Sequence, residues 1–170
     1  MTKFKKILKA LGLILLAGFI IIQFFHTEKN LSNDYTNDIS KVYPVPDEIR
    51  EILRTSCDDC HSNATVYPWY SNIQPVDWWL QDHVNEGKKE LNFSEFGTYR
   101  PYRQYRKFEE IIEQVKEEEM PLPSYLIIHQ SSKLSADQRL KLTNWAQSMR
   151  DQMVATFPPD SLINPKKRKS

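Results

Sequence analysis

Both cysteines of this 170-residue chain lie in one pentapeptide, Cys57-Asp58-Asp59-Cys60-His61. Two cysteines this close together cannot link distant parts of a chain, so a fold stapled by disulfides is excluded. The spacing Cys-x-x-Cys-His is the attachment motif of c-type haem. Its two thiols can each add to a vinyl group of one porphyrin, and the next imidazole then lies beneath the iron. The motif predicts one covalent haem c on Cys57 and Cys60, with His61 as the proximal iron ligand.

Three other kinds of site could use the same residues. A thioredoxin-like dithiol needs a strand–helix context and a thiolate of low pKa, whereas this motif follows a predicted helix and contains two acidic residues that would raise the pKa of the thiols. A zinc site needs further ligands, for which only His83 and His129 remain. A disulfide between Cys57 and Cys60 closes a very short loop and stabilises little. A non-haem structural module with that disulfide is the third alternative for function.

The first 26 residues have the pattern of a membrane anchor. Between Ile7 and Phe25 the only charged residue is Lys9, and a helix over 7–25 would rise about 28 Å. Four lysines precede or edge this stretch, which predicts a cytoplasmic amino end and a periplasmic body. A cleaved signal peptide is the alternative, but residues 24–28 offer no small-x-small cleavage pattern. We therefore expect a single-pass protein of the bacterial inner membrane.

Charge is distributed unevenly along the chain. The 23 Lys and Arg residues, against 22 Asp and Glu, include four lysines before residue 27 and four basic residues at 166–169. Residues 27–165 keep 15 basic and 22 acidic residues, a net charge of −7. A nucleic-acid-binding protein would carry positive charge on its folded body, so this class is largely excluded. With 12% aromatic and 40% hydrophobic residues, the body is expected to fold.

Apolar residues recur at helical spacing in four stretches of the body. The predicted helices cover residues 46–56, 75–87, about 106–119 and 135–153. Ser135 and Gln138 form the pattern of a capping box at the start of the last one. No strand-like alternation and no internal repeat is found, which indicates an all-α fold. We expect an anchor at 1–26, a tether at 27–44, a haem-binding domain at 45–155 and a basic tail at 156–170.

The segments after the motif carry a family resemblance. They read Ser62-Asn63-Ala64-Thr65-Val66-Tyr67-Pro68-Trp69-Tyr70, Pro75-Val76-Asp77-Trp78-Trp79, His83-Val84-Asn85-Glu86-Gly87 and Leu91-Asn92-Phe93-Ser94-Glu95. With Met120-Pro121 and the helix 134–149, they resemble the bacterial haem-binding domain family over about residues 40–150. The resemblance implies a small c-type cytochrome whose order of helices is similar to class I cytochromes c. It implies haem binding and names no redox partner.

The sixth iron ligand can be sought among the remaining methionines and histidines. Met120 is the first choice, because it follows the third predicted helix and two prolines hold its loop extended. His83 is the rival, on an apolar helical face beside Trp79. His129 or an open site completes the alternatives. Met149 and Met153 lie at helical spacing from Trp145 and are expected in the core.

The sixth ligand decides the expected function. Iron held by His and Met is closed and suits single-electron transfer to a redox partner protein, whereas a weak or open site would allow peroxide reduction or gas binding. We expect an electron carrier and no enzyme, with a haem enzyme or sensor as the alternative. Trp69 and Trp79 are expected to pack against the haem and exclude water.

Overall fold

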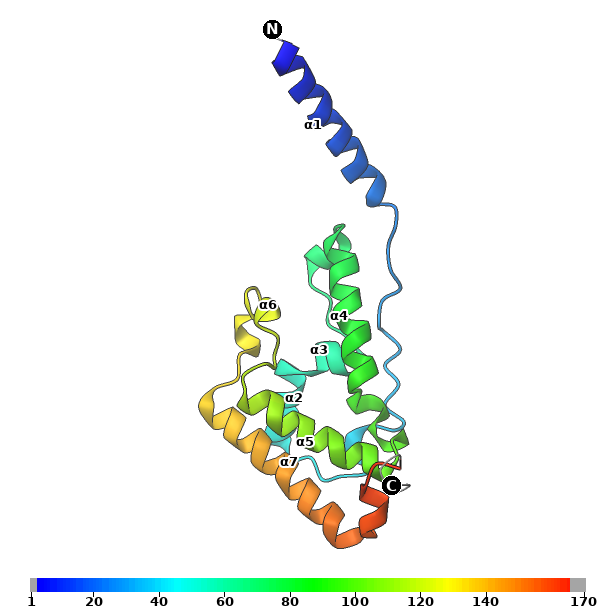
Figure 1. Cartoon of the computed structure of the whole chain (residues 1–170), viewed down its shortest axis with the longest axis vertical. Coiled ribbons are helices and arrows are strands. Elements are labelled where there is room, and N and C mark those ends of the chain that lie inside the picture. The colour runs from blue at the N-terminus through cyan, green and yellow to red at the C-terminus, as the bar shows by residue number, and fades with distance from the viewer. Residues whose placement is uncertain (1–2, 166–170) are drawn as a thin grey trace.

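The computed structural model describes residues 3–165, and every regular element in this range is helical (Figure 1). The α-helices are α1 (Lys3–Ile22), α2 (Asp47–Ser56), α3 (Asp58–His61), α4 (Val76–Glu90), α5 (Pro101–Lys116), α6 (Pro123–Leu126) and α7 (Ala136–Thr156). Short 3-10 helices connect them: η1 (Ile39–Lys41), η2 (Trp69–Asn72), η3 (Phe93–Thr98), η4 (Gln130–Ser132) and η5 (Pro159–Leu162). The predicted all-α class is confirmed. The basic residues 166–169 lie outside the described range.

Capping residues set where two of the predicted helices begin. Ser135 accepts from the Gln138 backbone amide at 3.1 Å, and the Gln138 side chain accepts from the Ser135 amide at 2.9 Å, so the capping box at the start of α7 is confirmed. The third helix begins at Pro101 rather than near Arg106. Proline suits the first helical turn because its missing amide hydrogen would have no intrahelical partner there. This earlier start was missed because residues 99–106 alternate aromatic and basic side chains without an apolar stripe.

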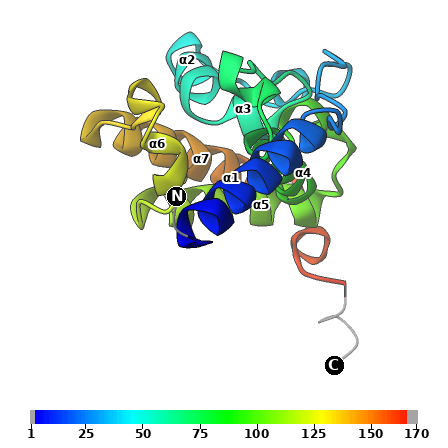
Figure 2. The same ribbon diagram turned by 90° about the horizontal axis from the view of Figure 1, so that it is seen from above.

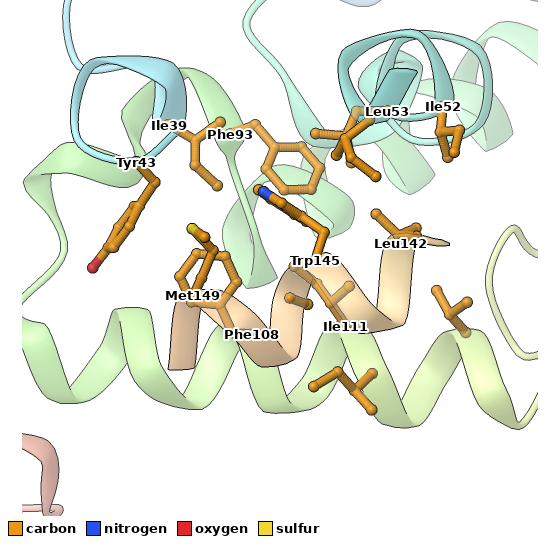
Figure 3. Close-up of a cluster of buried hydrophobic side chains, with 14 of the residues drawn as sticks. Ile39, Tyr43, Ile52, Leu53, Phe93, Phe108, Ile111, Leu142, Trp145 and Met149 are labelled. Carbon is orange, nitrogen blue, oxygen red and sulfur yellow. The ribbon is translucent and has the colours of Figure 1, made fainter. Parts of the chain in front are cut away.

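The hydrophobic core lies between α5, α7 and α2, with η1 and η3 closing it (Figure 3). Phe108 of α5 is fully buried and meets Trp145 of α7 edge-on, with 5.6 Å between ring centroids. Met149 and Met153 of α7 are buried here, as expected. Cys57, the first residue of the Cys-x-x-Cys-His motif, packs against this core where α2 ends.

The prediction of a membrane-spanning helix is wrong. No helix within residues 3–165 is long and apolar enough to cross a membrane. Helix α1 begins at Lys3, so its lysines lie inside the helix, and it ends at Ile22, before Phe24 and Phe25. Its uncharged part, Ala10 to Ile22, therefore rises only about 20 Å, short of a hydrocarbon core of about 30 Å. The predicted single-pass location in the inner membrane depended on this helix and is therefore not supported either.

Residues 23–45, which include the expected tether, lie along the helical body instead of hanging free. The Gln23 side chain donates to Gln74 O at 3.2 Å, and the Thr27 amide donates to the buried carboxylate of Asp77 at 3.0 Å. Further along, the Asn30 side chain donates to Ser62 O at 2.8 Å, just after the haem motif. The segment therefore supports α4 and the loop that follows the motif.

Candidate functional site

The haem motif occupies one face of a short helical turn. Helix α2 ends at Ser56, and Cys57 both caps α2 and opens α3. The amides of Cys60 and His61 donate back to Cys57 O at 3.2 and 3.0 Å. Residues three and four apart in a helix share a face, so Cys57, Cys60 and His61 project together. The short helix therefore brings the two cysteines and the histidine together, as the spacing of the motif predicts.

All three motif side chains line one cavity with a volume of about 370 Å³. This volume falls in the range of pockets that bind small molecules and cofactors. Its apolar walls come from several elements: Leu53, Leu91, Phe93, Ile111, Val115, Leu122 and Leu142. Met120 and Pro121 line it as well. The structure thus gathers the two thiols, the imidazole and a thioether around one apolar space.

The imidazole of His61 is held in one tautomer. Its Nδ1 lies 2.9 Å from Gly87 O and 2.9 Å from Leu91 O, at the end of α4. Carbonyl oxygens only accept hydrogen bonds, so Nδ1 carries the proton and Nε2 keeps a free lone pair. Burial lowers the pKa of His61, which favours the neutral ring. A neutral imidazole with its other nitrogen anchored is the form that binds a metal ion.

Gly87 permits this arrangement by its lack of a side chain. A Cβ built at Gly87 would lie 2.6 Å from the backbone oxygen of Cys60. Only glycine allows α4 to approach α3 closely enough for Gly87 O to reach His61. The role of this glycine was missed at the sequence level, because nothing in its neighbours signals a contact with residue 60.

The two thiols lie in a site that favours their protonated form. Burial, with the nearby charge of Asp58 or Asp59, raises the pKa of Cys57 to about 12 and that of Cys60 to about 11. Both cysteines are free thiols. A thioredoxin-like dithiol needs a thiolate of low pKa, so these values oppose that alternative. Among residues 3–165, no three His, Cys, Asp or Glu residues are grouped so that they could bind a metal ion.

Met120 reaches the cavity from the end of α5. That helix ends in a Schellman motif, with Glu118 in the left-handed conformation at φ 58°. The amides of Glu119 and Met120 then donate to Gln114 O at 3.0 and 3.2 Å. These bonds fix the backbone of Met120 just before Pro121. They leave its thioether on the cavity wall.

Comparison with known families agrees with this geometry. A family model described as a haem-binding domain matches residues 17–148, more than three quarters of the chain. The chain belongs to the haem-binding domain family. No curated protein and no solved structure matches the chain. The match establishes haem binding and leaves the mode of attachment to the residues of the site.

The haem-binding domain brings together some of the predicted site residues and separates others. His83 lines the cavity, with Nδ1 2.8 Å from Trp79 O. His129 lies outside this cavity, and both of its ring nitrogens are engaged, one with Tyr70 OH at 2.9 Å and one with Tyr125 O at 3.2 Å. Trp69 and Trp79 are 77% and 46% exposed and are not part of the cavity wall. Their packing against haem stays a prediction.

Two polar groups of the cavity wall were not expected from the sequence. Lys107 of α5 is buried and forms ion pairs with Glu110 at 2.5 Å and with Glu90 at 3.3 Å. Tyr125 of α6 donates its hydroxyl hydrogen to Asp59 Oδ2 at 2.7 Å, inside the haem motif. The contacts of Lys107 with Glu90 and of Tyr125 with Asp59 join residues 17 and 66 positions apart, so no local sequence pattern predicts them.

Proposed function

We propose that this haem-binding domain holds one haem covalently through Cys57 and Cys60, takes His61 as the proximal iron ligand, and carries single electrons. One observation supports this most strongly: Cys57, Cys60 and His61 belong to the same helical turn and line the same apolar cavity. When bound, the haem would supply an iron that accepts and releases one electron. The chain contributes attachment, axial ligation and shelter from water.

We further propose Met120 as the distal ligand. His61 Nδ1 is held by the carbonyls of Gly87 in α4 and of Leu91 just after it, so α4 lies on the proximal side of the site. His83 belongs to that same helix, one turn before Gly87. Met120 comes from the segment between α5 and α6, and α6 stands apart from α4 in both views of the molecule (Figure 1, Figure 2). A ligand opposite His61 is therefore better supplied by Met120 than by His83.

Iron held by histidine and methionine has no open position for a substrate, which favours an electron carrier over a haem enzyme or gas sensor. The donor and acceptor of the electron would be a separate redox protein. The buried, apolar wall raises the reduction potential because it disfavours the charged ferric site. Rapid binding of carbon monoxide by the reduced protein, without prior loss of a ligand, would contradict this assignment and indicate an open site.

Covalent attachment can be tested directly. The full chain is expressed in a host with haem-attachment machinery and run on a denaturing gel stained for haem peroxidase activity. We expect stain on the wild type and none on the Cys57→Ser/Cys60→Ser double variant, because only thioether bonds survive denaturation. An unstained wild-type band of normal abundance would refute the proposal.

The distal ligand has its own test in the visible spectrum of the ferric protein. Met120→Ala should abolish the iron–sulfur charge-transfer band, because no other thioether lines the cavity within the described residues. His83→Ala is the matched control and should keep the band. Loss of the band in the His83 variant alone would transfer the role to His83.

A further inference from the structure

The segment that carries Met120 is fastened directly to the haem motif. After Pro121 the chain turns through α6, and the hydroxyl of Tyr125 donates to Asp59 Oδ2 at 2.7 Å. Asp59 lies between the two attachment cysteines. The contact joins residues 66 positions apart in the chain. Asp59 is itself held in place, because its Oδ1 accepts from the Val66 amide at 3.0 Å. The Asp59 carboxylate is therefore already oriented to accept the hydrogen bond from Tyr125.

The ring of Tyr125 is held as firmly as its hydroxyl. It stacks on His129, with ring centroids 4.0 Å apart and planes 12° from parallel. His129 in turn forms a hydrogen bond with Tyr70 OH through Nε2 at 2.9 Å, which ties the residues after α6 to η2. The segment of residues 121–129 therefore meets the body through Tyr125 and His129.

Met120 itself has fewer constraints. Upstream, its amide is held by the C-terminal cap of α5. Downstream, Pro121 lacks an amide hydrogen and Leu122 packs on the cavity wall. The contact of Tyr125 with Asp59 is the nearest downstream hydrogen bond in this segment that reaches the haem motif.

We infer that Tyr125 is a positioning residue for the distal ligand: its hydrogen bond to Asp59 latches the 120–129 segment onto the haem motif and holds Met120 on the iron. The inference rests on the proposed function, since it assigns the latch to the Met120 ligation proposed above. A hydrogen bond to a charged acceptor is stronger than one between neutral groups, so its loss should be felt at the ligand.

The direct test is competition for the iron by imidazole. Full-length ferric holoprotein is titrated with imidazole, which must displace Met120 to bind. In Tyr125→Phe the ring and its stacking on His129 remain and only the hydroxyl is lost. We expect imidazole to bind this variant about ten-fold or more tightly than the wild type, because the latch no longer opposes release of the methionine.

Tyr43→Phe is the matched control. Tyr43 also donates a buried hydroxyl, to Gln104 Oε1 at 2.7 Å, but it lies in the core and not on the 120–129 segment. Its imidazole affinity should equal that of the wild type. Equal affinities in Tyr125→Phe and Tyr43→Phe would overturn the inference, since a general loss of stability would move both variants alike.

A second measurement separates this inference from the proposed function. Hydrogen exchange is followed in the haem-free full chain at the amides of Leu126 and His129, which donate to Leu122 O and Tyr125 O. We expect exchange about ten-fold faster in Tyr125→Phe than in Tyr43→Phe, with α7 unchanged. Unchanged exchange would refute the latch. Absence of covalent haem from the wild type would refute the proposed function, and the exchange result would still decide whether Tyr125 holds the segment.

Discussion

The two walls of the cavity are built differently. On the His61 side, backbone meets backbone: α3 and α4 touch where Gly87 has no side chain, and two carbonyls hold the imidazole. On the Met120 side, a helix cap and a side-chain hydrogen bond hold a loop. Direct backbone packing has few alternative arrangements, whereas a loop held by two contacts can detach and return. For the ligation proposed above, this difference predicts that His61 stays in place while Met120 can be displaced.

The largest effect should come from filling the contact between α3 and α4. Gly87→Ala places a Cβ 2.6 Å from Cys60 O, and both atoms belong to regular helices that cannot turn aside. We expect the free energy of unfolding of the haem-free protein to fall by about 2 kcal/mol, measured by urea denaturation. Hydrogen exchange of residues 120–129, on the Met120 side, should not change.

Gly18→Ala is the control for this substitution. A Cβ at Gly18 would meet nothing within 4 Å, so the free energy of unfolding should stay constant or rise slightly. A Gly87 variant as stable as the Gly18 variant would show that the His61 wall is looser than its geometry indicates.

A smaller effect of opposite sign is expected at Asp58, also on the His61 side. Burial raises the pKa of Asp58 to about 6, and its Oδ1 is buried without a hydrogen-bond partner. The unfolded carboxyl has a pKa near 3.8, so the folded state binds the proton more tightly and loses stability as pH rises from about 4 to 6. Asp58→Asn should raise the free energy of unfolding by about 1–2 kcal/mol at pH 7.5.

The same variant should show little gain at pH 4, where the Asp58 carboxyl of the folded wild type is already neutral. Urea unfolding of the haem-free proteins at both pH values measures the difference. Asp59→Asn is the matched control, and it should destabilise at pH 7.5 because Asp59 accepts two hydrogen bonds. If Asp58→Asn raised the free energy of unfolding equally at both pH values, the buried charge of Asp58 would not be the cause of the gain.

The smallest effect is expected on the Met120 side. Glu118 adopts φ 58°, which glycine tolerates without strain, so Glu118→Gly should raise the free energy of unfolding by up to about 1 kcal/mol. The gain is reduced by loss of the ion pair between Glu118 and Arg139 at 3.1 Å, an exposed pair of small value. Thermal unfolding of the haem-free protein provides the measurement.

The neighbouring Glu117 supplies the control for Glu118. Its φ is −80°, a conformation open to any residue, so Glu117→Gly should lower the thermal midpoint through the added freedom of the unfolded chain. If both glycine variants lowered the midpoint equally, strain at Glu118 would not contribute to the loop that carries Met120.

Sequence reasoning succeeded where the relevant chemistry is local. The motif spacing, the apolar stripe of α2, and the Ser135–Gln138 capping box all depend on residues within one or two helical turns. The structure places Met120, which follows a helix end and precedes two prolines, on the cavity wall, and its role as an iron ligand stays a prediction. The predicted start of α5 was wrong because the alternating aromatic and basic residues of its first turn form no apolar stripe.

The expectations that failed or stayed untested depend on distance. Apolar residues 7–25 resemble a membrane span only if one helix contains them all, and the turn after Ile22 divides them. Trp69 and Trp79 have the composition of cofactor walls, yet a residue type does not say which side of a helix meets the cavity.

The sequence by itself determined the Cys-x-x-Cys-His motif, the helical fold class and the candidate ligands, because each depends on residues that are neighbours along the chain. Only the tertiary structure decided that α4 holds His61, that Gly87 allows it, and that Tyr125 meets Asp59. These contacts join residues 26 to 66 positions apart. Their formation depends on how whole helices pack, and packing is a property of the assembled core rather than of any local pattern.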